Sequence, residues 1–440
     1  MSAPAAAVTQ RGRSSDPRPS PPRSPAVLGR WTSAQTRNLE RHALALRPFT
    51  REEFGTGHAA PTQGHVEAVN ALITRLREPL LTLNRRVAAI AARAQADPSP
   101  ERLRQLVTAG EVAHEHVRAV ERIWDFYMGF FGQRQGRFGE WLLGCDRIAL
   151  DCYQDAFLGL GTAKSVPQPA PMSCMEAGPT PATFRRDVRL RRLGFQRNPF
   201  PQIQLPYHRL VNPWTLGAVL HEVSHNLQNE LGLARVVPET LERRLAEAGH
   251  PPEVARVWRR WNRETFADLC GLLLGGPAVV ASLMDILARA PASVWTYNPT
   301  AVHPTPWLRL FVSAELLSRM GFPEDADGSR KAWRRTYGRR AAPYPKAMLE
   351  SADDAVRLVV DTMCFRPYET LGRRSLAQVI RFAPKEQQMI EEAARRLARG
   401  IDPGILPERF LIGAARLAFD RRLAPPEVIT RHFYRDLARR

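Results

Sequence analysis

Hydrophobic residues recur at helical spacing along most of this chain. Between residues 66 and 94 apolar side chains return every three or four positions, which predicts a long amphipathic helix that Pro79 kinks or divides. In contrast, the polar and basic segment 323–345 is predicted to be a loop. The same periodicity predicts further helices at residues 31–47, 100–126, 239–248, 306–320, 347–363, 384–398, 406–423 and 426–437.

Strand signals are few and are confined to one stretch of the chain. Residues 188–207 contain short alternating runs, and the run Ile203-Gln204-Leu205 stops at Pro206, as expected for an edge strand. Residues 166–181 are rich in Pro and Gly and are predicted to form a loop. The pattern therefore predicts a mainly α (α+β) fold with a small sheet.

One apolar helical segment carries a chemical motif. It begins at Asn212-Pro213, an N-cap residue followed by proline at the first helical position, and ends near Gly232. Within it, His221-Glu222-x-x-His225 places two imidazoles four residues apart on one helix face, where both can bind one zinc ion. Glu222 then lies where it can take a proton from water as a general base.

A second predicted helix, residues 252–275, has two carboxylates within its apolar stripe. Glu264 follows His225 by 39 residues and is a suitable third zinc ligand. Asp268, one turn later, can accept a hydrogen bond from the free ring nitrogen of a ligating histidine. The alternative is that the two carboxylates pair with Arg259 or Arg263, although these arginines belong to other faces of the helix.

A later segment, His303-Pro304-x-Pro-x-x-Arg309, supplies candidates for contact with the substrate. His303 or Tyr297 could stabilise an oxyanion, and Arg309 could bind a substrate carbonyl. The alternative is that Arg309 caps local carbonyl groups and that His303 lines a loop.

Together these residues resemble the gluzincin metallopeptidases, which combine His-Glu-x-x-His with a later Glu-x-x-x-Asp. The His-Pro…Arg segment is similar to the branch that includes the zinc CAAX endopeptidases. The resemblance covers residues 212–320 and implies a zincin-like core of helices with a small sheet. It implies His221, His225 and Glu264 as Zn²⁺ ligands, Glu222 as catalytic base, and a peptide or protein as substrate.

Two features separate this chain from that branch. Its members commonly carry transmembrane helices, whereas the most apolar run here, residues 269–284, is too short and is interrupted by Gly275-Gly276-Pro277. An additional charged helix is also predicted between His225 and Glu264. The expected regions are a disordered Pro- and Arg-rich tail (1–30), a helical N-terminal region (31–187), a zincin-like catalytic region (188–322) and a helical C-terminal region (323–440).

Composition changes this interpretation only a little. The net charge of +19 comes almost entirely from arginines spread along the chain, and no nucleic-acid-binding motif accompanies them. The 5 scattered cysteines include no C-x-x-C pair, and the first 26 residues lack the apolar region of a secretory signal. A cytoplasmic zinc metallopeptidase is therefore expected. The alternatives are a zincin-like scaffold without turnover and a basic nucleic-acid-associated protein with structural zinc.

Overall fold

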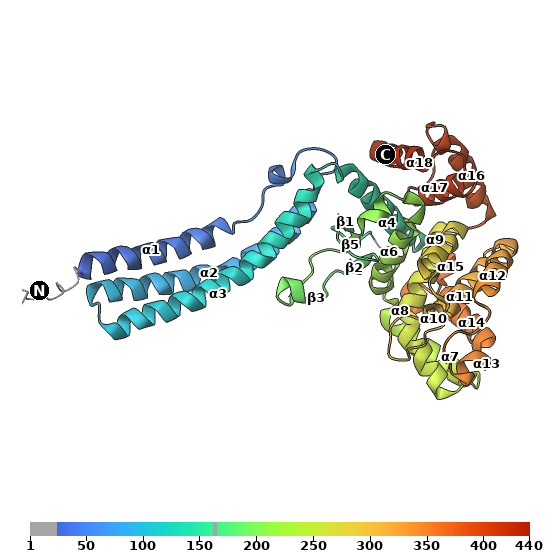
Figure 1. The fold of residues 1–440 in the computed structure, drawn as a ribbon, viewed down its shortest axis with the longest axis horizontal. Coiled ribbons are helices and arrows are strands. Elements are labelled where there is room, and N and C mark those ends of the chain that lie inside the picture. The colour runs from blue at the N-terminus through green and yellow to red at the C-terminus, as the bar shows by residue number, and fades with distance from the viewer. Residues whose placement is uncertain (1–23, 162–164) are drawn as a thin grey trace, which may run out of the picture. The chain divides into compact units, whose positions relative to one another are not determined.

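The computed structural model describes residues 24–161 and 165–440. About 70% of the chain is helical, and the strands form only two small sheets, which confirms the predicted mainly α (α+β) class (Figure 1). Of the predicted disordered tail, residues 1–30, the first 23 residues lie outside the described part of the chain. Its last residues belong to helix α1 (Ser24–Ala45), so that prediction extended too far along the chain.

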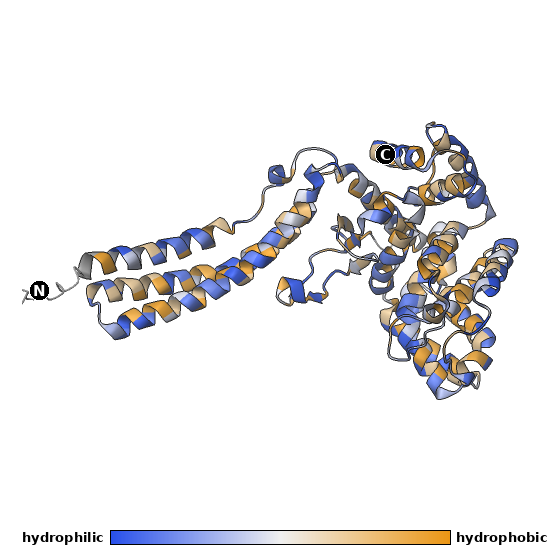
Figure 2. Ribbon diagram, viewed as in Figure 1, coloured by the Kyte–Doolittle hydropathy of each residue, from blue (hydrophilic) through white to orange (hydrophobic). Residues whose placement is uncertain are grey.

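By packing, the chain divides into two compact units. The first contains the residues up to Pro48 together with Ile73–Trp124, and the second contains Phe49–Leu72 with Asp125–Arg440. The first unit is built from α1 and from parts of two long helices, α2 (Gln63–Ala96) and α3 (Pro100–Gly132). Apolar and polar residues alternate along these helices (Figure 2), and the apolar ones, such as Leu39, form a separate core. Helix α2 is a single helix with Pro79 inside it.

The second unit holds the predicted motifs. It contains helices α4 to α18 and one large core of buried residues. The helices are α4 (Gly139–Gly159), α5 (Tyr207–Leu210), α6 (Gly217–Glu230), α7 (Leu233–Glu247), α8 (Pro252–Gly275), α9 (Pro277–Leu287), α10 (Pro291–Val294), α11 (Pro306–Arg319), α12 (Pro323–Tyr337), α13 (Lys346–Glu350), α14 (Ala352–Val360), α15 (Leu376–Val379), α16 (Pro384–Ala398), α17 (Phe410–Asp420) and α18 (Pro426–Arg439).

The larger sheet has three strands in the order β1-β5-β2. Strand β5 (Gln202–Leu205) lies in the centre, parallel to β1 (Met172–Met175) and antiparallel to β2 (Ala182–Phe184). The prediction of an edge strand at 203–205 is therefore wrong. Pro206 follows the last paired residue, so every residue of β5 keeps its N–H group for the two ladders.

Strand β1 lies within the segment predicted as a loop. Prolines and glycines dominate that segment, but Met172, Ser173 and Cys174 are buried and pair along β5. A second sheet is a hairpin of β3 (Arg189–Leu190) and β4 (Gln196–Arg197), which lies between β2 and β5 in the sequence.

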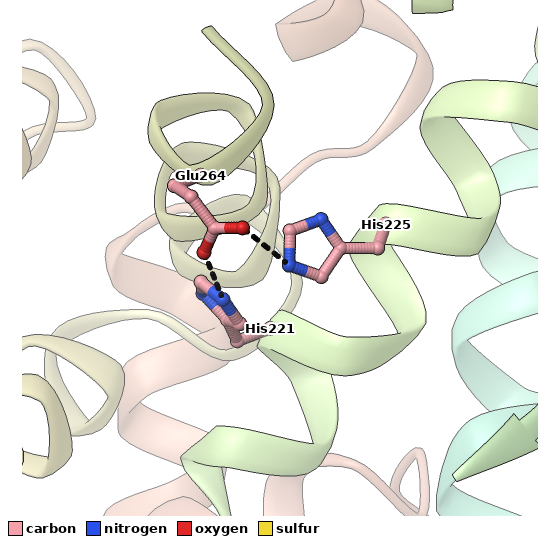
Figure 3. A group of neighbouring side chains, drawn as sticks. All are labelled: His221, His225 and Glu264. Carbon is pink, nitrogen blue, oxygen red and sulfur yellow. Dashed lines mark ion pairs between the residues drawn. The ribbon is translucent and has the colours of Figure 1, made fainter. Parts of the chain in front are cut away.

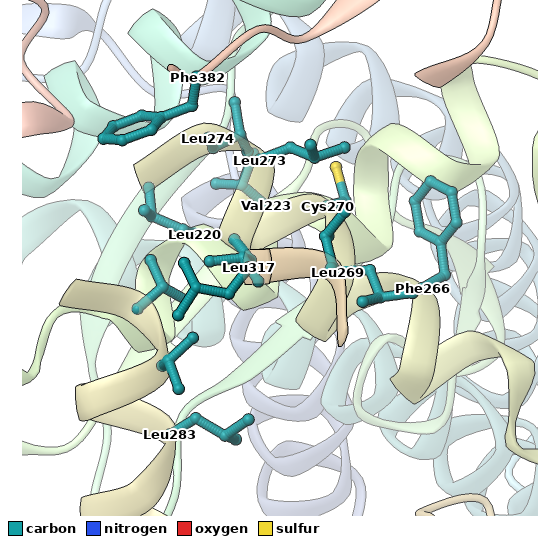
Figure 4. Close-up of a cluster of buried hydrophobic side chains, with 14 of the residues drawn as sticks. Leu220, Val223, Phe266, Leu269, Cys270, Leu273, Leu274, Leu283, Leu317 and Phe382 are labelled. Carbon is teal, nitrogen blue, oxygen red and sulfur yellow. The ribbon is translucent and has the colours of Figure 1, made fainter. Parts of the chain in front are cut away.

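Helices α6 and α8 pack closely at the centre of the unit. Two glycines of α8 allow this approach: a Cβ atom on Gly271 would lie 3.4 Å from the backbone nitrogen of His221, and one on Gly275 would lie 2.5 Å from Leu220 Cδ1. Apolar side chains of both helices fill the surrounding core (Figure 4). Burying one such leucine contributes about 1.5–3 kcal/mol, so this helix pair is a stable base for a site.

Several predicted boundaries need correction. The turn at Asn212-Pro213 is a 3₁₀ turn (Pro213–Thr215), and α6 begins only at Gly217. Helix α7 begins earlier than predicted, at Leu233. The first part of the segment predicted as a loop at 323–345 forms α12, because Ala326, Trp333 and Tyr337 give this otherwise polar helix a buried face, whereas residues 338–345 form a loop as predicted. Helices α8, α11, α16 and α18 occur where they were predicted.

Two further predictions concern the environment of the protein. Within the described residues, no helix is long and apolar enough to cross a membrane. All five cysteines are buried and free.

Candidate metal centre

Three side chains predicted as ligands converge between α6 and α8 (Figure 3). The Nε2 atom of His221 lies 3.4 Å from Glu264 Oε2, and the Nε2 atom of His225 lies 3.6 Å from Glu264 Oε1. One ligand atom can be chosen from each of the three residues so that all three atoms lie within 4.8 Å of one another. Since α6 supplies both histidines one turn apart and α8 supplies the carboxylate, the close packing of the two helices creates the site.

A hydrogen bond to Asp268 fixes the orientation of the His221 ring. His221 Nδ1 lies 2.9 Å from Asp268 Oδ1, one turn along α8 from Glu264. A proton on Nδ1 donated to Asp268 leaves the Nε2 lone pair directed at the group of ligand atoms, which is the usual arrangement behind a metal-binding histidine. His225 differs, because its Nδ1 atom is buried and has no hydrogen-bond partner among the described residues.

Arg309 completes this support from a third helix. Its Nε and Nη2 atoms donate to the two oxygens of Asp268 at 2.8 and 2.7 Å, and the whole pair is buried. The predicted contact of Arg309 with substrate remains a prediction, but sequence reasoning missed its partner. Asp268 does pair with an arginine, although neither Arg259 nor Arg263 is that arginine.

The predicted base is buried beside the ligands. Glu222 is 7% exposed and lines the same cavity as His221, His225 and Glu264. Burial, partly offset by the charge of His221, raises the pKa of Glu222 to about 7. A carboxylate with such a pKa can both accept and return a proton near neutral pH.

The protein without metal distributes its protons unequally over the ligands. Burial disfavours the imidazolium form of His221, but hydrogen bonds to Asp268 and Glu264 outweigh burial and raise its pKa to about 10. For His225 burial prevails and lowers the pKa to about 4. Although burial opposes ionisation of Glu264, its histidine neighbours hold its pKa well below the ordinary value. The carboxylate is therefore ionised and ready for a cation.

The two remaining candidates differ in their positions. His303 is exposed, but its Nε2 atom lies 3.1 Å from Glu264 Oε2 and it lines the cavity. Tyr297 is not among the cavity residues. Its ring packs edge-on against the rings of Trp261 and Tyr344, with ring centroids 6.0 and 5.3 Å apart. The structure thus brings His303, but not Tyr297, to the ligands.

The site opens into a cavity of about 340 Å³. One wall is the edge strand β2 with the two residues before it, and Asn226 connects this wall to α6 by donating to Thr183 Oγ1 at 2.8 Å. An apolar wall comes from α9 and the end of α8. Sequence reasoning missed both walls, because no local pattern indicates that these segments meet.

No protein family model, curated protein or solved structure matches this chain. The resemblance to gluzincins therefore depends on the residues themselves.

The donor set fits a zinc ion by its chemistry. Two imidazole nitrogens and one carboxylate, with space on the cavity side, are the ligands of an open catalytic zinc site. Ligands of a tetrahedral zinc ion lie about 3.3 Å apart, given bond lengths of about 2.0–2.1 Å. The nitrogen–oxygen separations of 3.4 and 3.6 Å, each to a different oxygen of Glu264, are close to that spacing, whereas a set with one ligand atom per residue extends to 4.8 Å.

Proposed function

We propose that this protein is a zinc-dependent metallopeptidase. The observation that carries the proposal is the convergence of His221, His225 and Glu264 in one cavity with the buried Glu222. When bound by these three residues, zinc would supply a Lewis acid that polarises the scissile carbonyl and lowers the pKa of a water molecule.

The protein's own groups would perform the proton transfers. Glu222 takes a proton from the attacking water and returns it to the leaving amine, which matches its burial beside the ligands. His303, exposed at the mouth of the site, is the candidate donor to the developing oxyanion. Asp268 and Arg309 hold His221 in place and do not themselves react.

An extended peptide has one suitable docking edge. The strand predicted as an edge at 203–205 is central, but β2 is an edge strand and lines the cavity. A substrate strand paired along Ala182–Phe184 would pass the ligand group, with backbone hydrogen bonds supplying affinity. The free, buried cysteines suit a reducing compartment, so the proposal includes a cytoplasmic location.

The test compares metal content and hydrolysis in Glu222→Gln. We expect about one zinc ion per chain in both wild type and variant, with hydrolysis of unfolded casein only by the wild type. Glu253→Gln, an exposed carboxylate on α8, is the matched control and retains activity. His221→Ala loses the metal.

Two outcomes would contradict the proposal. Absence of stoichiometric zinc from zinc-supplemented wild type would refute the metal site. Bound zinc without chelator-sensitive hydrolysis of any peptide would favour the scaffold alternative.

A further inference from the structure

Arg263 is a cation in the cavity wall that forms no ion pair with any described residue. It precedes Glu264 on α8 and lines the cavity. Within the part of the chain that the structure describes, it forms no ion pair, and its Nε atom is buried without a hydrogen-bond partner. Three carboxylates line the cavity. Glu264 is paired with histidines and Asp268 with Arg309, whereas Glu222 forms no ion pair with Arg263 among the described residues, although the charge of Arg263 acts to lower its pKa.

A second arginine lies close to the first. Arg185 directly follows β2 and is partly buried, and it too forms no ion pair among the described residues. Burial lowers the pKa of Arg185, and the positive charge of Arg263 lowers it further. Two arginines whose positive charges act on each other, and neither of which forms an ion pair with a described residue, are suited to binding an anion.

The opposite end of the cavity is apolar. Helices α6 and α8 run antiparallel, since Gln228 Nε2 contacts Asn262 Oδ1 at 3.1 Å while Leu220 lies against Gly275. Arg263 is thus at one end of the paired segment. Leu272, about 12 Å further along α8 than Glu264, is at the other end, where it lines the cavity with Val279, Val280, Leu283 and Ile286.

The ligand group therefore lies between a cationic end and an apolar end of one cavity. We propose that Arg263, assisted by Arg185, binds a carboxylate of the substrate beside the scissile bond, while an aliphatic side chain occupies the apolar end. This inference rests on the proposed peptidase function and specifies its substrate class: peptides that carry a carboxylate close to the bond that is cut. The carboxylate can belong to an acidic side chain or to a free C-terminus.

The general charge of the protein does not explain such a preference. The net charge of +19 attracts any acidic peptide weakly, and salt screens that attraction. A partly buried guanidinium that forms charge-assisted hydrogen bonds discriminates by position along the peptide and favours the carboxylate over the neutral amide by about 10- to 100-fold.

The test uses blocked, quenched fluorescent peptides built around a single leucine. Asp or Asn occupies each neighbouring position in turn, and a parallel set has a free or an amidated C-terminus. For zinc-loaded wild type we expect kcat/KM about 10- to 100-fold higher for the carboxylate at one position. Whether Asp or the free C-terminus produces this preference identifies the source of the carboxylate.

The variants assign the preference to its residue. Arg263→Gln should abolish it, mainly through KM, whereas Arg263→Lys should retain part of it. Arg256→Gln, an exposed arginine two turns earlier on α8 that does not line the cavity, should leave it unchanged. If Arg263→Gln does not fold, Arg185→Gln serves as the second variant, and it should weaken the preference for the carboxylate peptide.

Failure of this inference can be separated from failure of the proposed function. Hydrolysis with equal rates for Asp and Asn peptides, or a preference unchanged in both Arg263 variants, overturns the inference alone. If no peptide is cut, fluorescence anisotropy can still compare how tightly labelled Asp and Asn peptides bind to Glu222→Gln, and this comparison tests the inference. Tighter binding of the Asp peptide that depends on Arg263 supports the inference, and equal binding refutes it.

Discussion

Replacing Arg309 by methionine should destabilise the protein far more than loss of an ordinary arginine. Methionine keeps the aliphatic part of the side chain but removes the guanidinium from Asp268. The carboxylate then remains buried with His221 as its remaining hydrogen-bond partner.

The magnitude follows from the burial of both partners. The side chains of Arg309 and Asp268 are only 10% and 4% exposed, and two hydrogen bonds of 2.8 and 2.7 Å join them. Removing one member of a buried pair costs about 3–5 kcal/mol when the other charge is left uncompensated. Since the imidazolium of His221 still faces Asp268 in the metal-free protein, we expect a loss toward the lower end of this range. Since Asp268 also orients His221, zinc affinity should fall about 10- to 100-fold.

The assay is urea unfolding of metal-free protein followed by tryptophan fluorescence, combined with competitive zinc titration. The control is Arg395→Met, which removes an exposed pair with Glu392 on α16 and should cost less than about 1 kcal/mol. A loss for Arg309→Met no larger than that of the control, with unchanged zinc affinity, would refute the role of Arg309 as support for the site.

The remaining predictions concern stability outside the ligand group. Burial lowers the pKa of His65, whose ring lies between Thr62 and the carbonyl oxygen of Ala170, so its neutral form stabilises the folded protein. Its contribution to stability is present above the unfolded pKa of about 6.5 and is lost as pH falls below that value. The melting temperature should therefore fall less between pH 7.5 and pH 5.5 in His65→Gln than in the wild type. An equal fall in both proteins would contradict this. Gly275→Ala should cost about 1–3 kcal/mol in urea unfolding, because the new methyl group would lie 2.5 Å from Leu220 Cδ1. Gly129→Ala, in α3 with open space around it, should instead be neutral or stabilising by up to about 1 kcal/mol, and the reverse order of the two variants would refute the packing argument.

Sequence periodicity predicted the helices that carry the ligands because the relevant signals are local. His221 and His225 are one turn apart on a helix, and so are Glu264 and Asp268, so each pair could be assigned to one face without knowledge of the fold. The joining of the two helices was inferred from chemistry: two carboxylates in an apolar stripe need partners. The structure provides those partners in histidines and in Arg309.

The elements that were missed depend on long-range packing. Strand β2 and its pairing with β5 leave no alternating pattern, since β2 has three residues, none of them fully buried. Helix α12 has only three buried residues, so its sequence resembles an exposed loop. The apolar wall of α9 overlaps the most apolar run of the chain, but nothing in its sequence distinguishes the side chains that line a cavity from those that fill the core.

The two explanations weighed for Glu264 and Asp268 each account for one of the carboxylates. Asp268 pairs with an arginine, but that arginine comes from α11, a helix that the spacing along α8 could not reveal. Because Arg309 neutralises Asp268, the carboxylates whose charge remains available to a cation in the cavity are Glu264 and, when it is ionised, Glu222. With Arg309 removed, three carboxylates would surround the site, and protonation of one of them would compete with the metal. In the proposed metallopeptidase, the bidentate pair would therefore both orient His221 and limit the negative charge beside the zinc ion.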